Sequence, residues 1–391
     1  MIVRYEAWGA WVKLESAAAI VAVDRDGMRS LGLDGGDAWT AARRTVSPPL
    51  EVHLAVTSRC GAGCKGCYLD ARPDGAEPPR EDLEALLDAM QEAGVFTVAF
   101  GGGEPTTRDD LADLAEAARR RGLTPVVTTS GLGLSDARLE RLRAFAQVNV
   151  SYDGSSATYA QVRGFDGAGA AERAIEKLAK AGVRVGVNVV LTRESFPRLA
   201  ETLDRAKALG ACEAQLLRYK PAGRAASLDY LAQRMTPEQV LSFPVVLRSL
   251  SHALSSDGAF GLRIDCALVP FLSTDPELTS DPERLARFGI FGCEAGGALA
   301  AVTATGHVAP CSFAPATTLT GRDLASGYDG DAELGRWRAW VDAPPEPCAS
   351  CAIRRVCKGG CKVVSGFVDG VHGPDPECPR VRSNRRKALD P

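Results

Sequence analysis

The chain has 391 residues, of which 45% are hydrophobic and 24% are charged, and its formal net charge is −3. These values are ordinary for a globular protein of two or more domains, and they argue against nucleic acid as a partner because phosphate binding needs a basic surface. No apolar stretch reaches the length of a membrane span, and Arg4 and Glu6 stand where a signal peptide would be apolar. We therefore expect a cytoplasmic protein with no membrane partner.

Residues 1–48 predict a short β-rich extension. Strands are expected at Ile2–Tyr5, Trp11–Leu14 and Ala19–Val23, followed by a turn over residues 24–27. An exposed strand can pair with an extended peptide, so the extension is either a peptide-recognition element or a simple β cover on the main domain.

Residues 49–234 alternate between strand and helix patterns, which is typical of a parallel sheet. Sequence spacing alone leaves open whether such a sheet is flat or curled into a barrel. The expected strands are Glu51–Thr57, Val95–Phe100, Thr124–Thr128, Val148–Ser151, Val183–Leu191 and Cys212–Leu217. The expected helices between them are Arg80–Ala93, Leu111–Arg121, Asp136–Phe145, Ala170–Ala181 and Phe196–Leu209.

Residues 235–291 predict a mostly helical connector, and residues 292–391 a cysteine-rich domain. That last domain holds seven of the twelve cysteines and few long apolar runs, so we expect metal to supply part of its folding stability. Clustered cysteines in a reducing cytoplasm bind metal more often than they form disulfides.

The first cysteine cluster, Cys60, Cys64 and Cys67, has the spacing CxxxCxxC directly after the first strand of the alternating region. Three thiolates on one loop suit an iron–sulfur cube with one open iron, which can chelate the amino and carboxylate groups of a bound molecule. Zinc is the alternative, but zinc prefers four ligands and no fourth Cys or His lies nearby in the sequence. The loop follows the carboxyl end of a strand, where parallel sheets place active sites.

A glycine-rich turn, Gly101-Gly102-Gly103-Glu104, follows the second strand of this region. Glycines let a ligand approach the backbone closely, and Glu104 is able to accept a hydrogen bond from an ammonium group. The alternative is an ordinary turn between a strand and a helix.

The stretch from Cys60 to Tyr68 and the Gly-Gly-Glu turn together resemble the signature of radical S-adenosylmethionine (SAM) enzymes. The resemblance implies an α/β fold, a partial (β/α)6 barrel, with a [4Fe–4S] cluster on Cys60, Cys64 and Cys67. It also implies that SAM is a cofactor whose methionine amino group binds at Gly102, Gly103 and Glu104. The further SAM contacts that it implies are Ser130, Ser151, Asp153, Arg163 and Asn188.

Two other features bear on this resemblance. Residues 220–224, Lys-Pro-Ala-Gly-Arg, resemble the PxGR turn of these enzymes. Gly66 departs from the family pattern, because the residue before the third cysteine is often an aromatic that packs on adenine. We expect Tyr68 to take part of that role.

The seven C-terminal cysteines resemble the SPASM domain of radical SAM enzymes, with a zinc ribbon as the alternative. The resemblance implies two auxiliary [4Fe–4S] clusters, and three in all. The first would use Cys293, Cys311 and Cys361. The second would use Cys348, Cys351, Cys357 and Cys378. The first set has three thiols, so its fourth iron is open, binds substrate or takes Cys266, which is otherwise a small buried residue. Cys212 is expected to pack in the core.

The double resemblance implies a radical SAM peptide maturase of the oxidoreductase type. Such an enzyme generates a 5′-deoxyadenosyl radical and takes a hydrogen atom from a ribosomally synthesised precursor peptide, leading to a crosslink or an altered side chain. It needs an electron donor such as flavodoxin or ferredoxin. The alternatives are the same chemistry on a protein residue (sulfatase-maturation type), a tetrapyrrole or another small molecule, and a non-catalytic iron–sulfur or zinc protein. The sequence assigns no catalytic acid or base.

Overall fold

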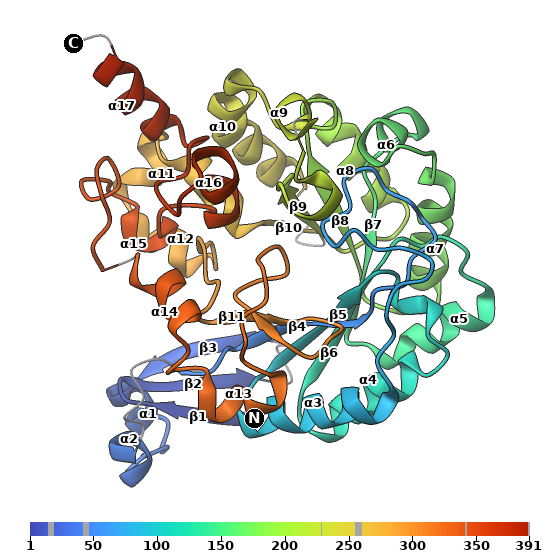
Figure 1. Ribbon diagram of the computed structural model, residues 1–391, viewed down its shortest axis with the longest axis horizontal. Coiled ribbons are helices and arrows are strands. Elements are labelled where there is room, and N and C mark those ends of the chain that lie inside the picture. Colours follow the sequence, from blue (N-terminus) through green and yellow to red (C-terminus); the bar gives the residue numbers. More distant parts are fainter. Residues whose placement is uncertain (15–18, 42–46, 228, 255–259, 341, 390–391) are drawn as a thin grey trace.

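The structure is a computed structural model that describes residues 1–14, 19–41, 47–227, 229–254, 260–340 and 342–389. Within these residues the strands form a small antiparallel sheet and a large, mainly parallel one. Figure 1 shows the small sheet beside one end of the large sheet, with the C-terminal region packed along the open side of the curve.

The small sheet contains β1 (Ile2–Glu6), β2 (Gly9–Leu14) and β3 (Ala19–Asp24) in that order, which confirms the expected strands. The turn expected over residues 24–27 is wrong. Asp24 instead caps helix α1 (Arg25–Ser30), because its carboxylate accepts the Gly27 N–H at 2.7 Å. A short helix, α2 (Asp37–Ala41), follows. Ala10, Val12, Met28 and Trp39 form a core that belongs to this region.

The small sheet contacts the end of the large sheet at which the parallel strands begin. The Arg4 guanidinium donates to the carbonyl of Gly94 at 3.0 Å, and the Lys13 ammonium donates to that of Gly122 at 2.9 Å. Both glycines end helix turns just before a parallel strand starts. The small sheet therefore lies away from the carboxyl ends of the strands, where the cysteine triplet is.

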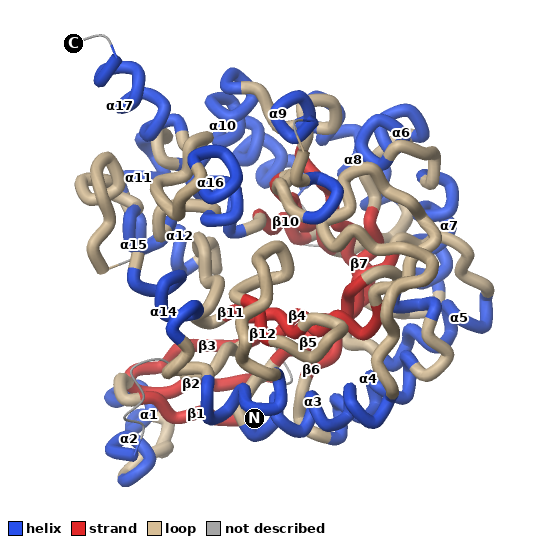
Figure 2. Tube along the Cα trace, viewed as in Figure 1, coloured by secondary structure: helices blue, strands red, loops and turns tan. Residues whose placement is uncertain are grey.

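The large sheet, within the described residues, has nine strands in the order β10-β9-β8-β7-β6-β5-β4-β11-β12. Its central six strands are parallel and correspond to the six expected from the sequence. They are β4 (Glu51–Thr57), β5 (Thr97–Gly102), β6 (Thr124–Thr129), β7 (Gln147–Ser151), β8 (Val185–Leu191) and β9 (Glu213–Arg218). Figure 2 shows these strands curving into a partial barrel with helices outside, which confirms the fold that the resemblance implied.

The outer helices bury small and aliphatic residues against the sheet, forming one apolar core. They are α3 (Arg80–Glu92), α4 (Leu111–Arg120), α5 (Asp136–Arg141), α6 (Ser156–Arg163), α7 (Ala168–Lys180) and α8 (Leu199–Ala208). Single 3-10 turns lie at Pro105–Thr107, Leu142–Ala144, Phe196–Arg198 and Gly223–Ala225. Helix α6 was not expected from the sequence.

The two edges of the large sheet are extended by later parts of the chain. From the connector, β10 (Gly261–Ile264) pairs with β9 in parallel, so the expectation of a mostly helical connector missed a strand. At the other edge β11 (Leu299–Val302) pairs with β4 in parallel, and β12 (Val308–Ala309) pairs with β11.

The remaining helices belong to the connector and the C-terminal region. The connector has α9 (Asp229–Gln233), α10 (Pro237–Leu254), the 3-10 helix η5 (Cys266–Leu272), α11 (Pro276–Ser280) and α12 (Pro282–Arg287). The C-terminal region has a 3-10 turn at Gly321–Asp323, then α13 (Leu324–Gly327), α14 (Ala332–Ala339), α15 (Arg354–Cys357), α16 (Lys362–Asp369) and α17 (Pro379–Leu389). Among the described residues, no helix has the length and apolar character of a membrane span.

Candidate active site

The loop of Cys60, Cys64 and Cys67 leaves β4 and is held by the turn that follows β9. The Arg224 guanidinium donates to the Cys64 carbonyl at 2.9 Å, and the Arg224 backbone N–H donates to the Cys67 carbonyl at 2.9 Å. Gly223 has a φ of +55°, and a Cβ there would lie 2.5 Å from the Cys67 carbonyl oxygen. The turn at residues 220–224 therefore fixes the backbone of the cysteine loop, a role that the sequence did not predict.

The Gly-Gly-Glu turn lies directly against the base of the same loop. The Glu104 N–H donates to the carbonyl of Arg59, the residue before Cys60, at 2.8 Å, and the Gly103 N–H donates to the Thr57 carbonyl at 2.7 Å. A Cβ at Gly103 would lie 2.1 Å from the Arg59 carbonyl oxygen, so only glycine allows this approach. The structure thus brings the two halves of the predicted motif together.

The Glu104 side chain is held in one orientation by the end of β6. Its Oε2 accepts hydrogen bonds from the Ser130 hydroxyl at 2.6 Å and the Ser130 N–H at 2.8 Å. Its Oε1 accepts from the hydroxyls of Thr106 at 2.7 Å and Thr129 at 2.8 Å. Ser130 was expected near the site, whereas Thr106, two residues after Glu104, was missed.

Arg163 reaches the site from the end of α6. Its Nε donates to Asp153 Oδ2 at 2.6 Å, and its carbonyl accepts the N–H of Lys65 in the cysteine loop at 2.9 Å. Burial favours the neutral form of Arg163, but the Asp153 carboxylate, Tyr159 and Cys64 together outweigh burial and raise the pKa of Arg163. The second oxygen of Asp153 accepts the Val190 N–H at 2.8 Å. Asp153 therefore positions Arg163 in this structure, and its expected contact with SAM stays a prediction.

Ser151 and Asn188 lie opposite each other on β7 and β8. Asn188 is buried, and its Nδ2 donates weakly to the Thr128 hydroxyl at 3.5 Å. Its Oδ1 is one of the few buried polar atoms of the described residues without a hydrogen-bond partner. Buried acceptors are almost always bonded, so an unpaired one suggests a missing donor. The hydroxyls of a SAM ribose are donors of this kind, so the residues present fit the cofactor.

Aromatic side chains border the loop at Gly66 and Tyr68. Tyr68 packs on Phe313 with ring centroids 4.8 Å apart, and burial raises its pKa to about 12. A Cβ at Gly66 would lie 2.8 Å from the ring of Tyr219, which stacks on Tyr230. The space that an aromatic residue at position 66 would need is thus filled by Tyr219, which the sequence did not single out.

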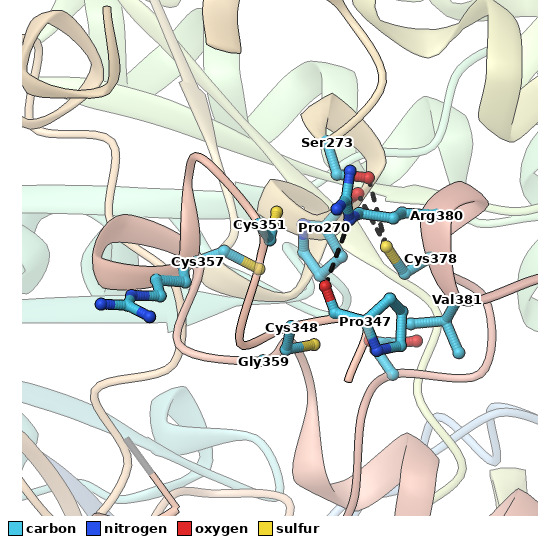
Figure 3. Close-up of a pocket in the computed structure, with 12 residues that line it drawn as sticks. Pro270, Ser273, Pro347, Cys348, Cys351, Cys357, Gly359, Cys378, Arg380 and Val381 are labelled. Atoms are coloured by element: carbon cyan, nitrogen blue, oxygen red, sulfur yellow. Dashed lines mark hydrogen bonds between the residues drawn. The ribbon is translucent and has the colours of Figure 1, made fainter. Parts of the chain in front are cut away.

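Four C-terminal cysteines line one cavity. They are the set Cys348, Cys351, Cys357 and Cys378, and Figure 3 shows their sulfur atoms gathered around it. Burial raises the pKa of the Cys348 thiol to about 12 and raises that of Cys357 as well. A bound cation overcomes this penalty because it stabilises thiolates. Within the described part of the chain, no three His, Cys, Asp or Glu side chains are grouped closely enough to hold a single metal ion.

Comparison with known proteins identifies the family. A profile of the Radical SAM superfamily matches residues 54–206, which contain both the cysteine triplet and the Gly-Gly-Glu turn. The PqqA peptide cyclase of Rhodopseudomonas palustris is 28% identical over 352 residues, which span 85% of this chain and 88% of the cyclase. The chain is a radical SAM enzyme. It belongs to the SPASM-containing group of that superfamily, and the superfamily's cofactors are a [4Fe–4S] cluster and SAM.

Other similarities extend over most of this radical SAM enzyme. The AdoMet-dependent heme synthase of Oleidesulfovibrio alaskensis is 27% identical over 356 residues, which span 86% of this chain and 88% of the synthase. The structure of Streptococcus suis SuiB bound to S-adenosylmethionine has a TM-score of 0.76 at 18% identity and covers 96% of this chain and 98% of SuiB. SuiB has also been solved bound to the precursor peptide SuiA. At this identity the structural similarity establishes the fold.

Proposed function

We propose that this radical SAM/SPASM enzyme modifies a ribosomally synthesised precursor peptide, either by forming a crosslink or by altering a side chain. The observation that carries the proposal is the similarity to a peptide cyclase over 85% of the chain, combined with a site in which the cysteine loop and the Gly-Gly-Glu turn are in contact. The fold shared with SuiB, which binds a precursor peptide, supports it.

In this proposal, different residues would hold the cluster and SAM. Cys60, Cys64 and Cys67 would hold the cluster, and the turn of Gly102, Gly103 and Glu104 would hold the methionine part of SAM. Tyr68, Ser130, Ser151, Asp153, Arg163 and Asn188 are the further SAM contacts of this proposal. When bound at these residues, the cluster and SAM would supply the reductive cleavage chemistry that gives a 5′-deoxyadenosyl radical. The protein's own part is to orient the cofactors and exclude solvent hydrogen from the site.

The C-terminal thiols would hold two auxiliary [4Fe–4S] clusters. Cys348, Cys351, Cys357 and Cys378 share a cavity, so they would form one ligand set. Cys293, Cys311 and Cys361 would contribute to the other. In this proposal residues 292–391 form the auxiliary-cluster domain, residues 235–291 the connector and residues 49–234 the radical SAM barrel.

The precursor peptide is the proposed partner of the N-terminal extension, residues 1–48. The strand order leaves β3 at an edge of the small sheet, and Ile20 and Val21 on it are exposed. An edge strand with exposed apolar residues is suited to pairing with an extended leader peptide. An electron donor such as flavodoxin or ferredoxin completes the proposed set of partners.

Co-expression with the candidate peptide, followed by mass spectrometry, tests the proposed function. The wild-type enzyme should change the peptide mass, and the reduced, anaerobically purified enzyme should release 5′-deoxyadenosine from SAM. The matched control is the Cys60→Ala, Cys64→Ala, Cys67→Ala variant, which should keep the auxiliary iron and lose both activities. A triple variant that still cleaves SAM would show that the active site is assigned wrongly.

A tetrapyrrole is the second candidate substrate, and the similarity to a heme synthase favours it. The two candidates differ in a measurable way. A peptide substrate predicts a mass change in the co-expressed peptide, whereas a tetrapyrrole predicts an unchanged peptide and SAM cleavage that depends on added porphyrin.

A further inference from the structure

Two exposed aromatic side chains lie near the cavity of the four C-terminal cysteines. Phe288 directly follows helix α12 and is 69% exposed, and Phe291 is 46% exposed. A single exposed aromatic residue is ordinary on a protein surface. Large apolar side chains that gather on one surface instead mark a place where another molecule binds.

The segment that carries these aromatics packs directly on helix α15. The Gly292 N–H donates to the Val356 carbonyl at 2.7 Å, and a Cβ at Gly292 would lie 2.0 Å from the Cys357 carbonyl oxygen. Figure 1 shows α12 and α15 next to each other in the C-terminal region. The aromatics therefore lie beside the helix that ends at Cys357, one of the four thiols around the cavity.

Three arginines surround the same cysteines. Arg354 and Arg355 are exposed on α15. Arg354 donates at 2.7 Å to a carbonyl of the loop between Cys348 and Cys351. Arg380 donates at 2.9 Å to a hydroxyl of the same loop, and Figure 3 shows it among the side chains that line the cavity.

The charge of these arginines is largely uncompensated. Within the described residues none of the three forms an ion pair, because the partners of two of them are neutral carbonyl and hydroxyl groups. The exposed Glu346 accepts a hydrogen bond from the Ser350 hydroxyl and offsets part of their charge. Residues 346–389 contain nine Lys or Arg and four Asp or Glu, in a chain whose net charge is −3. The region is thus basic within an otherwise acidic protein.

We propose that Phe288, Phe291, Arg354, Arg355 and Arg380 form a docking patch for an acidic electron-carrier protein. The docked carrier passes one electron to the auxiliary cluster held by the four thiols beside the patch. The carrier is oxidised and the cluster is reduced by that one electron, and no bond or proton changes place. This inference rests on the proposed function and on the proposed auxiliary clusters.

The position of the thiols favours an electron carrier over other acidic partners. Cys348 and Cys351 are only half-buried, so a cluster held there comes close to the surface at the patch. The loop of Cys60, Cys64 and Cys67 lies at the carboxyl ends of the strands, where SAM and the substrate bind in the proposed function. A carrier that docks on the patch leaves that entrance free.

The composition of the docking patch fits a transient protein contact. Aromatic residues and arginine are enriched in protein interfaces and carry most of their binding energy. Electron-transfer contacts are small and weak, and complementary charge controls how fast the partners meet. Binding through this patch should therefore weaken steeply as salt is added.

The test uses full-length, anaerobically reconstituted protein carrying Cys60→Ala, Cys64→Ala and Cys67→Ala, so that only auxiliary clusters are present. Biolayer interferometry measures its Kd for purified flavodoxin, an acidic one-electron carrier, at several salt concentrations. The Kd should rise with salt. Adding Phe288→Ser and Arg355→Glu should raise the Kd by about tenfold or more, which corresponds to about 1.4 kcal/mol.

Electron transfer gives a second measurement on the same two proteins. In a stopped-flow experiment, flavodoxin hydroquinone should reduce the auxiliary clusters more slowly in the docking-patch variant. Titanium(III) citrate is a small reductant that needs no docking, so it should reduce the clusters of both proteins at the same rate. That equality shows that the substitutions leave the clusters intact.

The matched control carries Leu231→Ser and Arg120→Glu in the same background. These are the same kinds of change at an exposed apolar residue and an exposed arginine outside the patch. The control variant should bind flavodoxin like its parent, because only the total charge of the protein has changed.

Several results would overturn the inference alone. They are a docking-patch variant that binds flavodoxin as tightly as its parent, a control variant that loses as much affinity, a Kd that does not depend on salt, and a patch that binds single-stranded RNA and not flavodoxin. A triple variant without iron would overturn the inference together with the auxiliary clusters. The proposed function fails by a different result, an unchanged peptide mass with the wild-type enzyme.

Discussion

Arg218 and Asp375 form a two-pronged ion pair in the interior of the protein. Arg218 Nη1 lies 2.5 Å from Asp375 Oδ2, and Arg218 Nη2 lies 3.0 Å from Asp375 Oδ1. Nη2 also donates to Glu377 at 2.9 Å. Arg218 ends β9 of the barrel, whereas both acids precede Cys378, so the pair links the barrel to the cysteine-rich region.

Replacing Arg218 by Met should strongly destabilise the protein. The change leaves Asp375 buried without its cation, and removing one partner of a buried pair typically costs about 3–5 kcal/mol. Urea unfolding of anaerobically reconstituted protein measures this free energy. Arg322→Met is the control, because its pair with Asp82 is exposed and such pairs contribute about 0–1 kcal/mol. Equal unfolding midpoints for the two variants would contradict the role given to Arg218.

Removing the Glu104 carboxylate should weaken SAM binding. Glu104→Ala leaves the Ser130 and Thr129 donors without an acceptor and removes the proposed partner of the SAM amino group. We expect the Kd for SAM to rise by about tenfold or more, which corresponds to about 1.4 kcal/mol. Equilibrium dialysis with the reconstituted enzyme measures the Kd, and the exposed Glu140→Ala variant should bind SAM like the wild type.

The unpaired Asn188 oxygen gives a separate prediction. Asn188→Ala should raise the Kd for SAM by about twofold to twelvefold, since a hydrogen bond between neutral groups contributes about 0.5–1.5 kcal/mol. Thr128→Val removes the weak partner of Asn188 Nδ2 and should change the Kd little. If the Thr128 variant lost as much affinity as the Asn188 variant, the effect would be structural and not a direct contact with SAM.

Gly66 and Tyr219 should behave as a coupled pair. Gly66→Phe alone should lower SAM affinity, because the new ring collides with Tyr219. Adding Tyr219→Ala makes room for that ring and should recover part of the lost affinity, although Tyr219→Ala alone is also expected to weaken binding. This non-additivity is measured as a double-mutant cycle of SAM dissociation constants. Additive effects would mean that the two positions do not share one space.

The central strands could be predicted because apolar, β-branched segments alternate regularly with amphipathic helices. Helix α6 was missed because residues 156–163 mix β-branched, aromatic and polar residues and have a weakly amphipathic pattern. The strands β10, β11 and β12 are four residues long or shorter, so their pairing depends on tertiary contacts and not on local pattern.

The candidate site also has features that the local sequence predicts and features that depend on tertiary contacts. Glu104 and Ser130, both expected at the site, meet because they follow adjacent parallel strands, whose carboxyl ends share one edge. The contributions of Tyr219 and Arg224 depend on three-dimensional proximity. Arg224, for example, is 160 positions from the Cys64 carbonyl that it binds. No spacing rule in the sequence connects such residues.

The strands at the two edges of the large sheet affect whether the protein can be divided into stable fragments. β10 pairs with β9 at one edge of the barrel sheet, and β11 pairs with β4 at the other edge. Cutting the chain near residue 234 would therefore remove the pairing strand from both edges. The isolated barrel fragment would then expose two rows of unpaired amide and carbonyl groups, and exposed sheet edges of this kind pair with other chains. Fragments cut at the domain boundaries expected from the sequence should therefore aggregate. Experiments on this protein should use the full-length chain.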